Sequence, residues 1–120
     1  MSTRSPITTH ILDTALGRPA AGVAITLSRQ LGEPTSTRWE PLATGHTDAD
    51  GRVGDLLAPG LARVGVYRIR FETGAYFRSI GVDAYFYPWA EIVFEIDDPS
   101  AHYHVPLLLN PFGYSTYRGS

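Results

Sequence analysis

Apolar and polar positions alternate along much of the chain with the two-residue period of a β-strand. In the first alternating segment, residues 7–13, His10 falls on the less apolar face together with Thr8. Turn residues, chiefly Gly, Pro, Asp and Asn, separate successive segments. The pattern predicts strands over residues 7–13, 23–31, 39–44, 65–72, 91–96, 102–109 and 114–118.

The period changes in one place. Residues 73–81 fit one or two turns of helix, with Thr73 as the N-cap and Gly81 as the stop, so we expect a helix over about residues 74–81. Short strands, short turns and one brief helix predict an all-β fold, an antiparallel β-sandwich. A length of 120 residues suits one domain over 1–120, with residues 1–6 expected to be flexible.

Composition narrows the function classes. A net charge of −2 argues against broad electrostatic binding to nucleic acid or to an anionic membrane. The chain has neither Cys nor Lys, which excludes disulfides, thiol catalysis, cysteine-ligated metal and a lysine nucleophile. Residues 1–10 contain no apolar core of signal-peptide length, and no apolar stretch would span a bilayer, so a cytoplasmic protein is expected.

A small set of residues remains once core and turn positions are set aside: His10, Arg52, His102, His104, Tyr117, Arg118 and Ser120. On a strand His102 and His104 point to one face. Residue types alone leave three interpretations open: a histidine zinc site, metal-free hydrolysis with a histidine base, or a sandwich without chemistry. Asp48 and Asp50 fit only part of a calcium-loop pattern, which also needs a later Glu.

Motifs spread over nearly the whole chain carry a resemblance. They are residues 9–13 (THILD), 17–20 (GRPA), 47–52 (TDADGR), 102–109 (HYHVPLLL) and 117–120 (YRGS). In this order they resemble the transthyretin-like family, and within it the 5-hydroxyisourate hydrolase branch. The terminal tetrapeptide discriminates most, because the hormone carriers of the superfamily share the sandwich but lack it.

The resemblance implies two four-stranded sheets with a short helix, assembled as a homotetramer that is a dimer of dimers. A channel between dimers would be lined by Thr8, His10, Leu12, His104, Pro106, Leu108, Ser115 and Tyr117. The implied reaction opens the ring of 5-hydroxyisourate, a product of urate oxidation, to 2-oxo-4-hydroxy-4-carboxy-5-ureidoimidazoline. It needs no metal or organic cofactor. The alternative is a transthyretin-type carrier of small molecules without turnover.

The resemblance also implies residue roles. His10, Arg52, His104 and Ser120 would be catalytic, with the two histidines positioning and deprotonating water. His10, Arg52 and Tyr117 would bind substrate, and the Ser120 carboxylate would help to hold its polar rim. By strand parity Arg118 points away from Tyr117. The simplest interpretation of Arg118 is therefore a structural residue that pairs with a carboxylate. His102 lies nearer the turn and is expected at the surface.

Overall fold

The computed structural model describes residues 5–32 and 36–120, and within these ranges no helix is long and apolar enough to cross a membrane. The elements in chain order are β1 Ile7–Asp13, β2 Arg18–Pro19, β3 Ala24–Leu31, β4 Arg38–His46, β5 Arg52–Val53, β6 Gly65–Phe71, α1 Thr73–Ser79, β7 Ala90–Ile96, β8 Tyr103–Asn110 and β9 Gly113–Thr116. Most of the segment expected to be flexible, residues 1–6, lies outside the described ranges. Ser5 is described and buried, and its hydroxyl donates to the Ile7 carbonyl at 2.8 Å.

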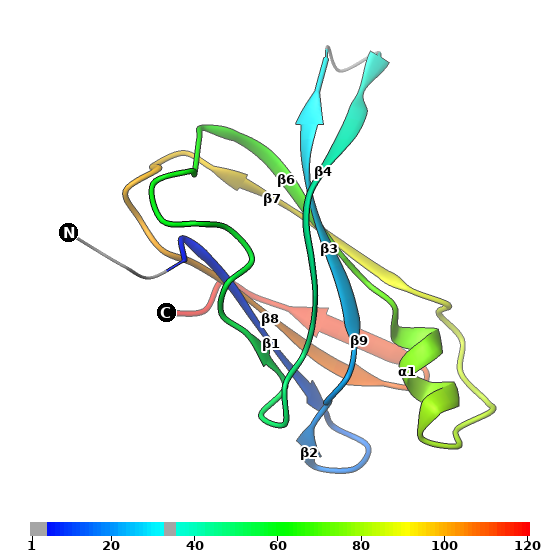
Figure 1. The fold of residues 1–120 in the computed structure, drawn as a ribbon. Helices are drawn as coiled ribbons and strands as arrows, with labels where there is room; N and C mark the ends of the chain where they lie inside the picture. The colour runs from blue at the N-terminus through cyan, green and yellow to red at the C-terminus, as the bar shows by residue number, and fades with distance from the viewer. Residues whose placement is uncertain (1–4, 33–35) are drawn as a thin grey trace.

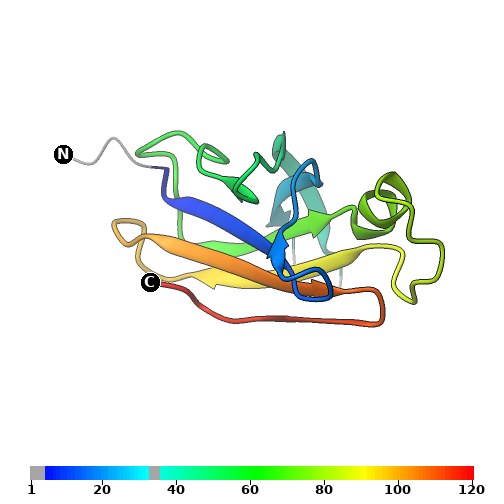
Figure 2. The same cartoon turned by 90° about the horizontal axis from the view of Figure 1, so that it is seen from below.

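Two sheets stack face to face, with α1 at one end of the sandwich (Figures 1 and 2). One sheet has the order β4-β3-β6-β7. The other has the order β2-β1-β8-β9, and β5 also pairs with β1. The predicted all-β sandwich with one short helix is confirmed.

The second sheet differs in detail from the expected antiparallel, four-stranded arrangement. β1 and β8 run parallel, with Thr8 opposite His104. The two-residue strands β2 and β5 share the other edge of β1, so this sheet counts five strands among the described residues. A parallel pair needs a long crossover, and here almost the whole domain connects β1 to β8.

Strand alternation places the core where the sequence predicts it. Ile7 and Ile11 of β1 are fully buried, whereas His10 on the opposite face is half-buried. In the facing sheet Ile25, Leu27, Ile69 and Phe71 are buried between the layers. The two apolar faces close on each other, and the outer face of the β1–β8 sheet stays available for polar side chains.

Helix α1 begins one residue earlier than predicted. Glu72 occupies the N-cap position without a side-chain cap, and Thr73 is the first helical residue rather than the cap. The Thr73 hydroxyl is buried and lacks a hydrogen-bond partner among the described residues. Gly81 follows the helix with a φ of +82°, as a C-terminal stop requires.

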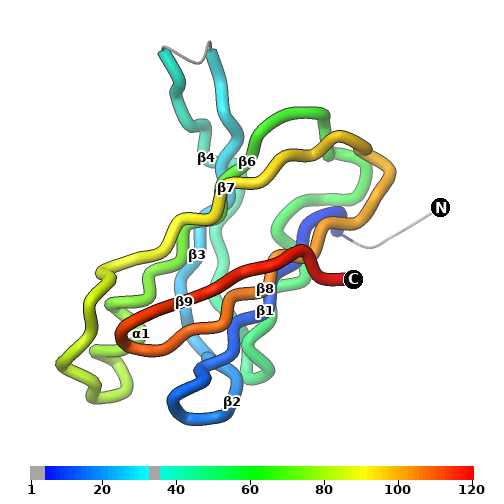
Figure 3. Tube along the Cα trace, turned by 180° about the vertical axis from the view of Figure 1, so that it is seen from behind, coloured from blue at the N-terminus to red at the C-terminus, as the bar shows by residue number. Residues whose placement is uncertain are grey.

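The last predicted strand is interrupted. β9 ends at Thr116, but Leu107 faces Thr116 and His104 faces Gly119, so the pairing resumes further on in unchanged register. Pro106 lies opposite the gap, and its missing N–H removes a hydrogen bond from the ladder there. The segment after β9 therefore follows β8 back toward the start of β1 without forming a continuous strand (Figure 3).

Asp13 ends β1 and anchors the turn that follows. Its carboxylate accepts the Tyr76 hydroxyl at 2.8 Å and the backbone N–H groups of Ala15 and Leu16 at 3.0 Å each. Asp13 is 1% exposed, and burial together with this hydrogen bond raises the pKa of Tyr76. The acidic residue of the 9–13 motif is therefore structural.

Asp13→Ala should lower the free energy of unfolding by about 3 kcal/mol, because several donors lose a buried acceptor. Urea unfolding followed by circular dichroism measures the change. Tyr76→Phe is the matched control: it removes one hydrogen bond and should cost about 1 kcal/mol. An Asp13→Ala variant as stable as Tyr76→Phe would contradict the anchoring role.

Candidate active site

A tight turn positions Arg52 at the site. The Asp48 carboxylate accepts the backbone N–H groups of Asp50 and Arg52 at 2.9 and 3.0 Å, and Gly51 turns the chain with a φ of +75°. The Gly51 carbonyl then accepts the Ile11 N–H at 2.7 Å. β5 is thereby fixed beside β1 with Arg52 directly opposite His10. The Asp48–Gly51 segment serves as a structural turn.

His104 is placed by the parallel pair of β1 and β8. Thr8 is its partner across the pair, and the Thr8 hydroxyl lies 2.8 Å from Nδ1 of the His104 ring. On the opposite face the Thr9 hydroxyl donates to the Val105 carbonyl at 2.6 Å, which fixes the register from within the core. Because His10 is two residues from Thr8, it lies on the same face of β1.

The tail, residues 117–120 after β9, passes over His104 at a glycine. The Gly119 N–H donates to the His104 carbonyl at 2.9 Å. A Cβ on Gly119 would lie 2.5 Å from ring atom Cδ2 of His104, closer than side chains approach. Glycine at 119 therefore allows the backbone to pass directly over the imidazole and brings Ser120 to the site.

Three predicted site residues meet around one open hollow of about 220 Å³, which Arg52, His104 and Ser120 line. The remaining lining residues are Thr8, Thr9, Val53 and Gly54. His10 does not line this hollow, but it is the cross-strand neighbour of Arg52. The structure thus brings the His104 imidazole of β8, the Arg52 guanidinium of β5 and the last residue, Ser120, to one hollow within a single chain.

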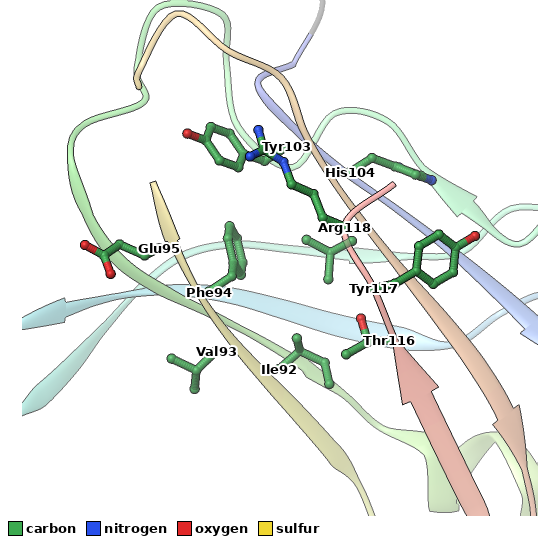
Figure 4. Close-up of a pocket in the computed structure, with 10 residues that line it drawn as sticks. Ile92, Val93, Phe94, Glu95, Tyr103, His104, Thr116, Tyr117 and Arg118 are labelled. Carbon is green, nitrogen blue, oxygen red and sulfur yellow. The ribbon is translucent and has the colours of Figure 1, made fainter. Parts of the chain in front are cut away.

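Tyr117 lies beside the hollow and not in it. It lines a separate apolar groove between β7 and the tail, to which His104 also contributes, and its side chain is 59% exposed. Figure 4 shows Tyr117 and His104 on one side of the tail and Arg118 on the other. Within this chain Tyr117 and Arg52 therefore line different cavities.

With the described residues Arg118 does not form the ion pair that the sequence suggested. Its guanidinium carbon stacks on the Tyr103 ring at 4.5 Å from the centroid, a cation–π contact (Figure 4). The ion pairs found among residues 5–32 and 36–120 join Arg29 to Glu40, Arg68 to Glu91, and Arg70 to Glu72 and Glu91. All of them involve the β4-β3-β6-β7 sheet and its edge.

The prediction that His102 is a surface residue is wrong. The ring is half-buried, with Nε2 at 2.9 Å from the Thr8 hydroxyl and Nδ1 at 3.1 Å from the Ser5 carbonyl. The spacing of His102 and His104 carried the signal, because both lie on one face of β8. What the sequence did not show is that the chain before β1 supplies a carbonyl group beside His102.

The charged groups near the hollow leave Arg52 available. Its side chain is exposed, and in the described part of the chain no carboxylate pairs with it. The nearby Asp48 carboxylate accepts two backbone N–H groups at its Oδ1 and forms no ion pair with Arg52. Because no carboxylate of the described residues forms an ion pair with this guanidinium, it can pair with an anionic group that enters the hollow.

The histidine zinc site considered from the sequence lacks a complete ligand set. Among the described residues no three His, Asp or Glu side chains gather closely enough to hold a metal ion. The arrangement suits a different chemistry. An imidazole accepts a proton, and a nearby guanidinium stabilises negative charge on an oxygen.

The fold and these residues define the class of protein: the chain belongs to the HIUase/Transthyretin family, whose model matches residues 7–119. It is 46% identical to the 5-hydroxyisourate hydrolase of Mus musculus, covering 97% of this chain and 96% of that protein. It is 48% identical to the 5-hydroxyisourate hydrolase 2 of Rhizobium meliloti, and each chain is fully covered.

Solved structures of both branches of the family are similar to this one. The 5-hydroxyisourate hydrolase of Klebsiella pneumoniae has a TM-score of 0.78 at 40% identity, over 95% of this chain and 98% of that one. Transthyretin of Sparus aurata has a TM-score of 0.87 at 37% identity, over 97% of each chain. Backbone similarity therefore does not distinguish the two branches. The residues of the site have to distinguish them.

Proposed function

We propose that this protein is a hydrolase that opens the ring of 5-hydroxyisourate and releases 2-oxo-4-hydroxy-4-carboxy-5-ureidoimidazoline. The observation that carries the proposal is the meeting of Arg52, His104 and Ser120 around one hollow, with His10 adjacent to Arg52. The names of the relatives that match nearly full length support the same reaction.

The reaction is a hydrolysis of a cyclic amide. The His104 imidazole takes a proton from water while the water oxygen bonds to the amide carbonyl carbon. The electron pair of the C=O bond moves to its oxygen, and Arg52 stabilises the resulting negative charge. When this intermediate collapses, the C–N bond breaks and the nitrogen takes the proton back from the imidazolium. The products are a carboxyl group and an N–H group.

The remaining site residues position the reactants. His10 lies across the strand pair from Arg52 and orients the substrate or the water. The Ser120 hydroxyl, brought in by the tail, offers a hydrogen bond at the opposite side of the hollow. Tyr117 would contribute to substrate binding from the neighbouring groove once subunits assemble.

The deciding experiment adds the protein to freshly prepared 5-hydroxyisourate and follows the decay of its absorbance. Acceleration over the spontaneous reaction is expected, and it should survive EDTA. Decay at the spontaneous rate would overturn the proposal. Equimolar binding of an aromatic ligand without turnover would instead favour a carrier, the activity of the transthyretin branch, one member of which has been solved with thyroxine.

The assembly is part of the proposal. We expect a homotetramer, a dimer of dimers, because the hollow is open and Tyr117 remains exposed beside it in one subunit. A facing subunit would enclose the substrate between two symmetry-related walls. Sedimentation at four chain masses supports this, and a monomer with full activity contradicts it. The cytoplasmic location stays a prediction, which cell fractionation tests.

Gly119→Ala should lower kcat about tenfold or more while the sandwich remains folded. The new Cβ would collide with the His104 ring, so either the tail or the imidazole has to move. Gly113→Ala on β9 is the matched control, because its Cβ would meet nothing closer than 3.8 Å. Equal activity of the two variants would show that the close approach at Gly119 does not position His104.

A further inference from the structure

A chain of hydrogen bonds runs from the segment before β1 to the imidazole of His104. The Ser5 carbonyl lies 3.1 Å from Nδ1 of His102, and Nε2 of that ring lies 2.9 Å from the Thr8 hydroxyl. The same hydroxyl lies 2.8 Å from Nδ1 of His104. The two rings are nearly parallel, with planes 14° apart and centroids 6.5 Å apart.

For neutral imidazoles, the chemistry of these groups determines the direction of each bond. A carbonyl oxygen only accepts, so Nδ1 of His102 carries the proton that it donates to Ser5. In a neutral imidazole the other nitrogen is then an acceptor, so the Thr8 hydroxyl donates to Nε2 of His102. A hydroxyl has a single proton. Its oxygen therefore accepts the Nδ1–H of His104.

We propose that Thr8 and His102 are positioning residues that hold His104 in the tautomer with the proton on Nδ1 and the lone pair on Nε2. This inference rests on the proposed function, in which His104 is the base, and it specifies which nitrogen of that base receives the proton from water. The opposite tautomer would place an N–H at Nε2, which donates and does not accept.

The location of these hydrogen bonds supports a role in positioning His104. Thr8, His102 and His104 are all half-buried, so their mutual hydrogen bonds compete less with water than they would at an exposed site. The parallel register of β1 and β8 holds Thr8 directly opposite His104. Ser5, whose carbonyl is the first acceptor in this series of hydrogen bonds, is a buried residue and is 5% exposed. The backbone carbonyl of Ser5 thus determines which nitrogen of each histidine carries a proton.

Nitrogen NMR of ¹⁵N-histidine protein tests the inference without substrate, because protonated and unprotonated ring nitrogens have well-separated shifts. The His104 signals are assigned by their loss in His104→Ala. In the unmodified protein at neutral pH, Nδ1 of His104 should carry the proton. In Thr8→Val both tautomers should be populated. In His102→Phe the Thr8 hydroxyl loses its acceptor and turns to Nδ1 of His104, so the proton should shift to Nε2.

Activity gives the second measurement. A wrong tautomer costs about 10⁴-fold in a serine protease. Since the productive tautomer remains accessible here, Thr8→Val should lower kcat about tenfold to hundredfold with little change in KM. Thr8→Ser keeps the hydroxyl and should restore both kcat and the tautomer. Thr26→Val, in the other sheet, is the control for a loss of a threonine hydroxyl in a strand.

The outcomes separate this inference from the proposed function. An unchanged His104 tautomer in both Thr8→Val and His102→Phe would overturn the inference, even if the protein hydrolyses 5-hydroxyisourate. A shifted tautomer in a protein that does not hydrolyse 5-hydroxyisourate would overturn the proposed function and leave the proton order intact. Failure of Thr8→Ser to restore the rate would also count against the positioning role.

Discussion

His104→Ala is expected to lower kcat by about 10²- to 10⁴-fold, the range that a positioned general base contributes. The imidazole is half-buried at the edge of the hollow and is held by Thr8 on one side, with the Gly119 backbone passing over it. The sandwich should persist, because the side chain points away from the buried face of β8. Steady-state kinetics on 5-hydroxyisourate, with circular dichroism to confirm folding, measure the effect.

His46→Ala is the matched control for this prediction. His46 is exposed on β4 in the other sheet, so its loss removes a histidine without touching the hollow. Its kinetics should equal those of the unmodified protein. If His104→Ala lost less than tenfold in kcat while remaining folded, His104 would not be the base, and His10 would be the next candidate.

Arg52→Ala is expected to lower kcat by about 10²- to 10³-fold, the usual cost of removing a group that stabilises a developing oxyanion. Thermal stability should change little, because the side chain is exposed and pairs with no carboxylate in the described part of the chain. Arg52→Lys should recover part of the rate: it restores the charge but not the planar, two-pronged donor.

Arg38→Ala controls for the loss of an exposed arginine, since Arg38 lies on β4 away from the hollow. Comparison of kcat with KM locates the contribution of Arg52. A rise in KM at constant kcat would mean that the guanidinium binds substrate and transition state equally, contrary to the proposed role.

The fold was predictable as far as side-chain alternation determines it. The two-residue period predicted the long strands and the less apolar face of β1, because burying apolar side chains on the other face dominates that choice. The period carries no information about which strands pair with each other. The parallel pairing of β1 with β8 and the short strands β2 and β5 were therefore not predictable. The break after Thr116 had a local cause in Pro106, but finding it required the register.

The identities of the site residues were more predictable than their arrangement in space. Parity placed His10 on the less apolar face of β1 and His104 on the same face of β8 as His102, but the meeting of Arg52 with Ser120 rested on the resemblance. The placement of His102 was not predictable, because one of its two partners, the Ser5 carbonyl, is a backbone group, and residue types do not reveal where backbone atoms lie. Tyr117 lies outside the hollow because its side chain lines the neighbouring groove beside β7, which residue types alone do not reveal.

The pairing of β1 with β8 has a consequence for how the protein folds. The hydroxyl of Thr8 meets two imidazoles that lie 94 and 96 residues further along the chain. Closing a loop of that length costs about 4 kcal/mol of entropy, and contacts of such separation form slowly. In a refolding experiment enzymatic activity should therefore return with the slowest phase, after most strand structure has formed.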